Sequence, residues 1–233
     1  MPERRALLEN WLRSVLDRDE VVLAPASGDA SFRRYWRLGH EGTSYIAMDA
    51  PPGQEDTDRF VRLARAWRDL GLRTPEIYRE NPQQGFLLLE DFGSRLYLDH
   101  LDGASADRLY GDALGALIII QACATTVGLP SYDGAFLRRE MALFQDWLVE
   151  RHLGLVLTAQ EEADLEAALA FLAASAQEQP RVCVHRDFHS RNLMITVSPS
   201  PGILDFQDAV AGPVTYDLVS LLRDCYIAWP RAR

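Results

Sequence analysis

Residues 185–192 read His-Arg-Asp-Phe-His-Ser-Arg-Asn, and residues 205–207 read Asp-Phe-Gln after a short apolar stretch. The first stretch has the form H-x-D-x-x-x-x-N, and the second supplies another aspartate. Phosphoryl transfer needs a group that orients and deprotonates the attacking hydroxyl, together with oxygen ligands for Mg²⁺. Asp187 suits the first role, and Asn192 and Asp205 suit the second. The pattern therefore predicts a metal-centred phosphoryl-transfer site in a loop between short strands.

Two plainer interpretations compete with this one. Asp and Asn also cap turns in ordinary loops, so the correctly placed Asp205 is what argues against coincidence. A zinc site built from Cys183, His185 and His189 is the second alternative, but the sequence offers neither a fourth ligand nor a Cys-x-x-Cys partner. We expect His185 to be a structural loop residue and His189 to lie at the surface or behind the site.

The composition is that of a globular protein. The chain has 233 residues, of which 48% are apolar and 25% charged, so it can bury a core as one large domain or two small lobes. Its apolar runs are too short for a membrane span, and the amino terminus has no apolar signal region, so we expect a cytoplasmic protein. Three widely spaced cysteines favour reduced thiols over a disulfide framework.

The charged residues disfavour nucleic acid as a partner and limit which side chains can contact phosphate. The formal net charge of −10 disfavours a nucleic-acid-binding protein. The basic stretch 33–37, which also contains Tyr35 and Trp36, is the one contrary signal, and we interpret it as part of a half-solvated hairpin. All 24 basic residues are arginine, so any contact with phosphate must use arginine or backbone N–H groups.

The first part of the chain predicts a small antiparallel sheet with helices. An amphipathic helix is expected around residues 7–16, and a second helix is expected over residues 57–70, with Gly71 as its stop. Short runs rich in β-branched and aromatic residues predict strands at 21–24, 32–38 and 44–48, and an apolar run ending in two acids occupies 86–91.

The second part of the chain is mostly helical. Helices are predicted over about 105–127, 134–152 and 158–176, the last opened by a capping box of Thr158 and Glu161. Short strands at 182–184, 193–195 and 203–204 surround the polar loop, and a final helix is expected over about 215–228. The prediction is an α+β fold with a small antiparallel-sheet N-lobe, residues 1–91, and a mostly helical C-lobe, residues 92–233.

Six stretches together resemble a known family. They are residues 27–35, 48–52, 86–91, 137–141, the loop at 185–192, and 204–209. The chain resembles the aminoglycoside phosphotransferase family of protein-kinase-like enzymes. Within it, the resemblance is greatest to bacterial kinases that phosphorylate the anomeric hydroxyl of N-acetylmuramate and N-acetylglucosamine in peptidoglycan recycling. It implies a two-lobed protein-kinase-like fold, ATP and Mg²⁺ as cofactors, and Asp187 as the catalytic base.

The resemblance also implies where the nucleotide binds. The loop over the ATP phosphates would comprise Ser27, Gly28, Asp29, Ala30 and Ser31, whose backbone N–H groups can serve as donors. The hinge that meets the adenine edge would comprise Leu89, Glu90 and Asp91. Without the resemblance, the first segment reads as an ordinary hairpin and the second as a strand end.

The sequence departs from the family pattern in two places. A lysine is expected on the third strand, but residues 47–49 read Ala-Met-Asp. We expect Arg34, projecting inward from the second strand, to replace it, with a solvated charge as the alternative. Relatives of this kind also continue well past the final helix, so we expect the C-terminal part, which helps to wall the acceptor pocket, to be missing.

The function implied is transfer of phosphate from ATP to the C1 hydroxyl of an amino sugar. Acceptor contacts are predicted at Arg138, Glu140 and Asp208, with ion pairing on the helix surface as the alternative for Arg138 and Glu140. Asp217 is expected to hold the catalytic loop. Two other functions remain open: a kinase for another small hydroxyl acceptor, such as an aminoglycoside or an amino alcohol, and a truncated non-catalytic pseudokinase. The predicted partners are small molecules, without nucleic acid or membrane.

Overall fold

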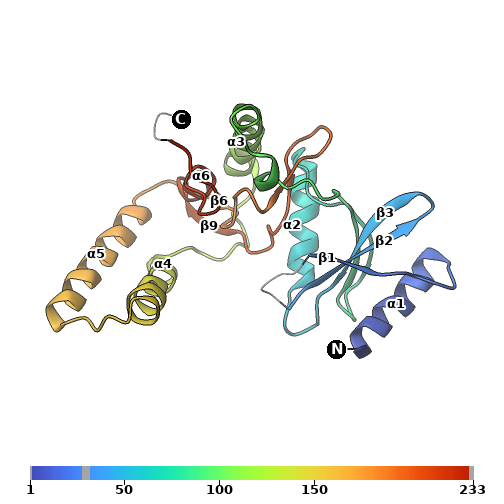
Figure 1. Cartoon of the computed structure of the whole chain (residues 1–233), viewed down its shortest axis with the longest axis horizontal. Helices are drawn as coiled ribbons and strands as arrows, with labels where there is room; N and C mark the ends of the chain where they lie inside the picture. The colour runs from blue at the N-terminus through green and yellow to red at the C-terminus, as the bar shows by residue number, and fades with distance from the viewer. Residues whose placement is uncertain (1, 28–31, 231–233) are drawn as a thin grey trace. The chain divides into compact units, whose positions relative to one another are not determined.

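The computed structural model describes residues 2–27 and 32–230 (Figure 1). The chain divides into two compact units. The first comprises Met1–Ala116 with Ser190–Gln207, and the second comprises Leu117–His189 with Asp208–Arg233. The predicted lobe boundary after residue 91 stays a prediction.

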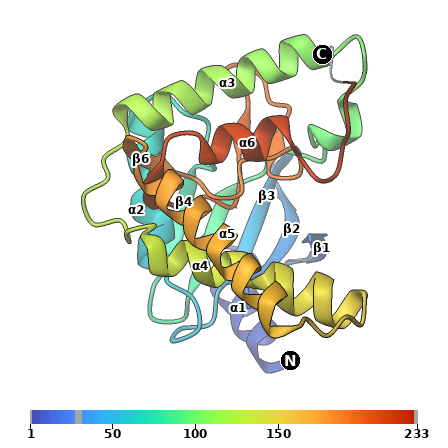
Figure 2. The same ribbon diagram turned by 90° about the vertical axis from the view of Figure 1, so that its left-hand side faces the viewer.

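The first unit contains a five-stranded antiparallel sheet in the order β1-β2-β3-β5-β4 (Figure 2). Its strands are β1 (Ala24–Ser27), β2 (Arg34–His40), β3 (Thr43–Asp49), β4 (Ile77–Asn81) and β5 (Phe86–Glu90). The strands predicted at 32–38 and 44–48 are confirmed within two residues, and the apolar run at 86–91 contains β5. The strand predicted at 21–24 is displaced, since β1 begins only at Ala24. The edge strand β4 was not predicted, because its residues are mostly polar and partly exposed.

One face of this sheet is covered by α1 (Pro2–Leu16), the helix predicted at the start of the chain. Leu8 and Leu12 of α1 are fully buried, and they belong to one cluster with Leu38, Ala47 and Leu88 from the sheet. Because side chains alternate along a strand, this cluster defines which residues of β2 and β3 face α1. The apolar stripe predicted from sequence is therefore used to cover the sheet.

The second helix, α2 (Thr57–Asp69), confirms the prediction for residues 57–70. The side chain of Asp56 caps it by accepting a 2.8 Å hydrogen bond from the backbone N–H of Arg59. The rings of Phe60 and Trp67 lie 4.9 and 5.7 Å from the ring of Phe206, which is fully buried. The helix thus holds the residue that follows Asp205.

The rest of the first unit contains a 3-10 turn, the start of a long helix and a short hairpin. The turn is Leu98–His100, and the helix α3 (Ala106–Cys123) falls within the range predicted for it. The hairpin consists of β7 (Leu193–Met194) and β8 (Gly202–Ile203). The hairpin is joined to the segment just before the 3-10 turn by a 2.9 Å hydrogen bond from the backbone N–H of Tyr97 to the carbonyl of Leu193.

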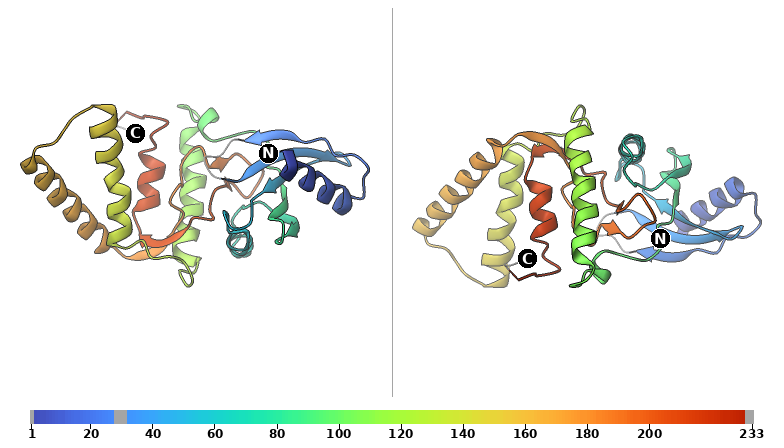
Figure 3. Two further views of the ribbon diagram at one scale, coloured as in Figure 1. Left: turned by 90° about the horizontal axis from the view of Figure 1, so that it is seen from below. Right: turned by 90° about the horizontal axis from the view of Figure 1, so that it is seen from above.

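The second unit contains two helical segments that lie beside each other (Figure 3). The first starts as α4 (Gly134–Leu143) and continues as a π-helical segment (Phe144–His152), which together occupy the range predicted as one helix. The other is α5 (Ala159–Gln177), and the predicted capping box of Thr158 and Glu161 is confirmed. Its buried core includes Leu137 of α4 and Ala173 of α5.

In the same unit, β6 (Arg181–Val184) pairs antiparallel with β9 (Val210–Pro213), a strand that was not predicted. The final helix α6 (Tyr216–Leu222) is shorter than predicted. Asp224 accepts a 2.8 Å hydrogen bond from the backbone N–H of Tyr226, a local turn that competes with continuation of the helix.

Two further findings concern membrane-spanning helices and the state of the cysteines. None of the helices in the described part of the chain is long and apolar enough to cross a membrane. Cys123, Cys183 and Cys225 are free, and burial raises the pKa of the Cys183 thiol to about 12.

Candidate active site

The loop that carries Asp187 follows β6 and is held by Asp217 of α6. The carboxylate of Asp217 accepts hydrogen bonds from the backbone N–H groups of His185, at 2.7 Å, and Arg186, at 3.0 Å. Both His185 and Asp217 are fully buried. The expected roles of Asp217 in holding the loop and of His185 as a structural residue agree with this arrangement.

Burial also changes the acidity of Asp217. Loss of solvent raises its pKa to about 7, although the backbone hydrogen bonds from His185 and Arg186 act in the opposite direction. The pair of N–H donors and the buried carboxylate therefore form a polar anchor whose charge depends on pH near neutrality.

Within the loop, the backbone bends sharply next to Asp187. Arg186 has a φ of 83°, a left-handed conformation that is uncommon for residues other than glycine. The backbone N–H of Asp187 lies 3.3 Å from Nδ1 of His185, and the carbonyl of Asp187 accepts a 3.0 Å hydrogen bond from the N–H of His189. These local bonds determine the conformation of the loop around the predicted base.

The side chain of Arg186 is fixed by α4. Its guanidinium forms an ion pair with Glu140 and lies 5.1 Å from the ring centre of Phe136. Glu140 also accepts a hydrogen bond from the hydroxyl of Tyr132, and burial together with this bond raises the pKa of Tyr132. Glu140, which was predicted to contact the acceptor, thus contacts the loop that carries Asp187.

Asn192 and Asp205 lie at the same end of the β7–β8 hairpin. Leu193 is paired with Ile203, and the backbone N–H of Leu204 donates a 2.9 Å hydrogen bond to the carbonyl of Asn192. Both candidate metal ligands belong to the first unit, whereas Asp187, five residues before Asn192, belongs to the second. The hairpin brings together the two residues predicted to bind metal.

The carboxylate of Asp205 is oriented by hydrogen-bond donors that include Gln207 and Arg33. Its Oδ1 atom accepts hydrogen bonds from Nε2 of Gln207, at 2.7 Å, and from Nη2 of Arg33, at 3.2 Å. Asp205 has a φ of 60°, and Phe206 next to it is fully buried. Neither of these bonds uses Oδ2.

This donor set fits Mg²⁺. An amide oxygen from Asn192 and a carboxylate oxygen from Asp205 are the hard ligands that this ion prefers. In contrast, the described residues contain no group of three or more His, Cys, Asp or Glu side chains able to hold a metal ion. Cys183, His185 and His189 therefore do not form a ready zinc site.

Two neighbouring arginines at the start of β2 differ in their surroundings. Arg33 is 7% exposed and, besides Asp205, approaches Glu55, with 3.8 Å between Nε and Oε2. Arg34 is exposed and is paired across the sheet with Asp49, whose carboxylate forms an ion pair with Arg4 of α1. Arg34 therefore lies on the α1 face, and the expected inward projection of its side chain is wrong. Sequence analysis missed Arg33, although it stands in the same basic stretch.

The predicted hinge continues the central strand β5. Leu89 is 2% exposed and is paired with β3 on one side and β4 on the other. Glu90 forms ion pairs with Arg68 and Arg73. These contacts hold the end of β5 in place, while the adenine-binding role of the segment stays a prediction.

Asp91 accepts hydrogen bonds from Arg37, Ser44 and the backbone N–H of Gly93, the first of them at 2.6 Å. Burial opposes its ionisation, but these donors prevail and lower the pKa of Asp91 below its ordinary value. Its side chain therefore serves to hold the chain where it leaves β5.

Comparison with known proteins identifies the family. The model of the phosphotransferase enzyme family matches residues 22–233. The chain belongs to this phosphotransferase family. A relative in Pseudomonas aeruginosa called N-acetylmuramate/N-acetylglucosamine kinase is 48% identical over 211 residues, covering 91% of this chain and 62% of the relative. A relative of the same name in Pseudomonas putida is 46% identical over 246 residues, covering 100% of this chain and 72% of the relative.

Solved structures confirm the α+β, protein-kinase-like fold of this phosphotransferase chain. Choline kinase LicA from Streptococcus pneumoniae has a TM-score of 0.63 at 17% identity, with 94% of this chain and 74% of that chain covered. Aminoglycoside phosphotransferase APH(4)-Ia has a TM-score of 0.62 at 17% identity, with 93% and 76% covered. The predicted resemblance is confirmed at the level of family and fold.

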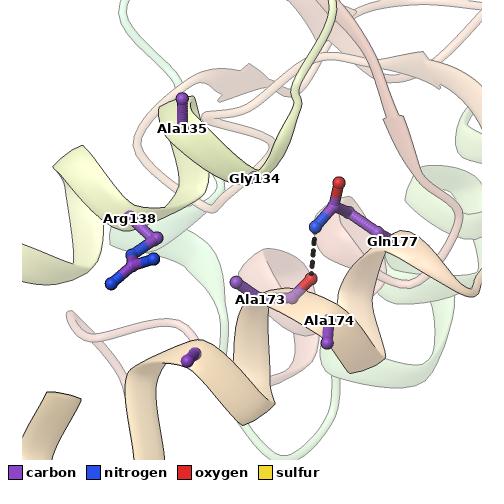
Figure 4. A pocket seen from close by; sticks show the side chains of 7 residues that line it. Gly134, Ala135, Arg138, Ala173, Ala174 and Gln177 are labelled. Carbon is purple, nitrogen blue, oxygen red and sulfur yellow. Dashed lines mark hydrogen bonds between the residues drawn. The ribbon is translucent and has the colours of Figure 1, made fainter. Parts of the chain in front are cut away.

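Two of the residues predicted to contact the acceptor, Arg138 and Asp208, lie at the surface of this phosphotransferase chain. Asp208 is exposed, and Arg138 of α4 is exposed and forms an ion pair with Glu166 of α5. Arg138 also lines a hollow of about 350 Å³ between α4 and α5, whose other lining residues are mostly alanine (Figure 4). No carboxylate side chain is among the residues that line this hollow, whereas phosphoryl transfer needs one as a base or a metal ligand. Acceptor contacts at Arg138, Glu140 and Asp208 stay predictions.

The predicted phosphate loop is described only at its start. Ser27 ends β1 opposite Tyr35 of β2. Gly28, Asp29, Ala30 and Ser31 lie outside the described residues.

Proposed function

We propose that this chain transfers the γ-phosphoryl group of ATP to the anomeric hydroxyl of N-acetylmuramate or N-acetylglucosamine. The products would be ADP and the sugar 1-phosphate. The chain spans about 62% of the length of the Pseudomonas aeruginosa relative, so the substrate rests on similarity across that share. The structural observation that supports the chemistry is the β7–β8 hairpin, which brings Asn192 and Asp205 together. Asn192 stands five residues after Asp187, whose loop is anchored.

In the proposed reaction, Asp187 accepts the proton of the C1 hydroxyl while the hydroxyl oxygen bonds to the γ-phosphorus. The bond between that phosphorus and the β,γ-bridging oxygen breaks, and ADP leaves with the electron pair. Asn192 and Asp205 would hold Mg²⁺, which when bound neutralises charge on the nucleotide phosphates. Asp217 keeps the loop in place, since it binds the N–H groups of the two residues before Asp187.

Nucleotide binding is proposed for the segment around β1, β2 and the end of β5. Ser27, Gly28, Asp29, Ala30 and Ser31 would provide backbone donors to the phosphates. Leu89, Glu90 and Asp91 would provide the hinge. The immobilised end of β5 supports the second assignment, because a rigid strand end presents its backbone groups in one orientation.

The experiment that tests the proposal is ³¹P NMR of the purified chain with ATP, Mg²⁺ and each acceptor in turn. We expect a sugar 1-phosphate signal with N-acetylmuramate or N-acetylglucosamine, and a rate about 10²–10⁴ times lower for Asp187→Asn. Asp146→Asn, an exposed aspartate of the π-helical segment, is the matched control and should keep its rate.

Other outcomes would overturn the proposal. A phosphorylated aminoglycoside or choline, without a sugar 1-phosphate, would reject the amino-sugar acceptor. Absence of any product, while calorimetry still shows nucleotide binding that depends on Mg²⁺, would reject catalysis by this chain and favour a non-catalytic binding protein.

A further inference from the structure

Because the chain has no lysine, another group must fix the side chains of the proposed metal site. No cation can come from β3 at residues 47–49, where Met48 is 1% exposed and the carboxylate of Asp49 forms an ion pair with Arg4 on the α1 face. A carboxylate that binds a metal needs its side chain fixed, and neighbouring donors normally do this. The donors to Asp205 therefore show how this chain fixes it.

Arg33 is one of these donors, and its position is unusual for an arginine. Its side chain is 6% exposed, while arginine is rarely buried unless it is paired. It stands between two carboxylates, with Nη2 at 3.2 Å from Asp205 and Nε at 3.8 Å from Glu55. Burial of a guanidinium between two acids costs desolvation energy, which is offset by the hydrogen bond to Asp205 and the ion pair with Glu55.

Glu55 connects this pair to the rest of the first unit. Its Oε1 atom accepts a 3.1 Å hydrogen bond from the backbone N–H of Phe32, the residue before Arg33. Glu55 immediately precedes Asp56, the N-cap of α2. The same helix packs Phe60 and Trp67 against Phe206, next to Asp205. Arg33 and α2 thus fix Asp205 from two sides, through its carboxylate and through the residue that follows it.

We propose that Arg33 is the positioning residue that orients the Asp205 carboxylate for the Mg²⁺–nucleotide complex, in place of the absent lysine. Arg33 and Gln207 both donate hydrogen bonds to Oδ1 of Asp205. Because the two oxygens belong to one planar carboxylate, these bonds also orient Oδ2. Arg33 acts through Asp205, so its removal weakens the binding of nucleotide with the metal rather than that of nucleotide alone. This inference deepens the proposed function and rests on its metal site.

The test is isothermal titration calorimetry of ADP binding to Arg33→Met, once with Mg²⁺ and once with EDTA. We expect the affinity for Mg²⁺–ADP to fall by about 10–100-fold, and the affinity for ADP in EDTA to stay within about twofold. Arg33→Lys keeps the charge and should recover part of the loss. Arg65→Met, which removes an exposed ion pair with Glu80 in the same unit, is the control and should change neither affinity.

The contrary outcomes are distinct. An equal loss with and without Mg²⁺ would show that Arg33 only maintains the local structure, and unchanged affinities would show that it does not position Asp205. If circular dichroism shows that Arg33→Met is unfolded, Glu55→Gln replaces it, with a smaller selective loss expected and an equal or absent loss overturning the inference. Wild-type binding that is no tighter with Mg²⁺ would also overturn it. A selective loss without a sugar 1-phosphate would leave this inference standing while the proposed acceptor fails.

Discussion

Oδ2 of Asp217 accepts a 2.7 Å hydrogen bond from the backbone N–H of His185, 32 positions earlier in the chain. Its Oδ1 atom accepts a second bond, from the N–H of Arg186. One buried side chain at the start of α6 thereby satisfies two backbone donors of the loop that carries Asp187.

Removal of the Asp217 carboxylate should destabilise the chain. Asp217→Ala leaves two N–H groups without their acceptor, at a cost of about 1–3 kcal/mol each, so the free energy of unfolding should fall by about 2–6 kcal/mol. Denaturation by urea, monitored by circular dichroism, measures this. Asp146→Ala, at an exposed position of the same unit, should stay within about 0.5 kcal/mol of wild type. Equal stability of the two variants would contradict the anchoring role.

The raised pKa of Asp217 predicts a pH dependence. The ordinary value is 3.8 and the folded-state value is about 7, so between about pH 4 and 7 the folded chain binds the extra proton. The contribution of Asp217 to stability is therefore fully present below pH 4 and is lost as the pH rises to 7. The unfolding free energy of wild type minus that of Asp217→Asn should fall across this window by an amount on the order of 2–4 kcal/mol. A difference that rises with pH would refute the assigned shift.

Glu140 and Glu166 provide a matched comparison. Glu140 pairs with Arg186 beside Asp187, whereas Glu166 pairs with Arg138 at an exposed position. Glu140→Gln should lower the unfolding free energy by about 1–2 kcal/mol, because it weakens a half-buried network with Tyr132. Glu166→Gln should change it by less than about 0.5 kcal/mol.

The same comparison separates the two roles considered for Glu140. If Glu140 contacts the acceptor without holding the loop, Glu140→Gln will raise the acceptor KM and leave stability unchanged. Steady-state kinetics and urea denaturation of the same preparation distinguish these results.

Gly85 and Gly93 differ in the space around them, although both have a positive φ, of 71° and 83°. A Cβ atom at Gly85 would lie 1.8 Å from the carbonyl oxygen of Ala50, while one at Gly93 would meet nothing within 4 Å. Gly93→Ala should cost about 1–2 kcal/mol, the strain of a left-handed residue. Gly85→Ala should cost clearly more, since backbone must move, and thermal unfolding should show the larger fall in Tm. Similar Tm values would argue against the close approach of β5 to Ala50.

The predictions from sequence succeeded where a local pattern has one structural meaning. The capping box of Thr158 and Glu161 placed the start of α5 correctly, because its two reciprocal hydrogen bonds involve only neighbouring residues. The same holds for the apolar stripe of α2 and for the spacing that put Asn192 and Asp205 at one hairpin. Such features need no information from distant parts of the chain.

The predictions failed where pairing partners decide the structure. β4 and β9 have weak sequence patterns and exist because they hydrogen-bond to β5 and β6, respectively. The final helix was predicted too long, since the apolar periodicity continues past Leu222 while the Asp224 turn ends the helix. These elements depend on competition between local propensity and tertiary contacts.

The sequence by itself determined the family and the α+β class, and it provided the candidates Asp187, Asn192 and Asp205 for the proposed site. It could not decide between Arg33 and Arg34, because adjacent residues of a strand face opposite sides and a pair of arginines is symmetric to any pattern. That choice was made by the tertiary structure. The pairing of Arg34 with Asp49 and the cover of α1 assign Arg34 to one face, and Arg33 alone of the two is paired with Asp205. Which side of a sheet becomes buried depends on the element that packs against it, and Asp205, the partner of Arg33, lies 172 positions away in the chain.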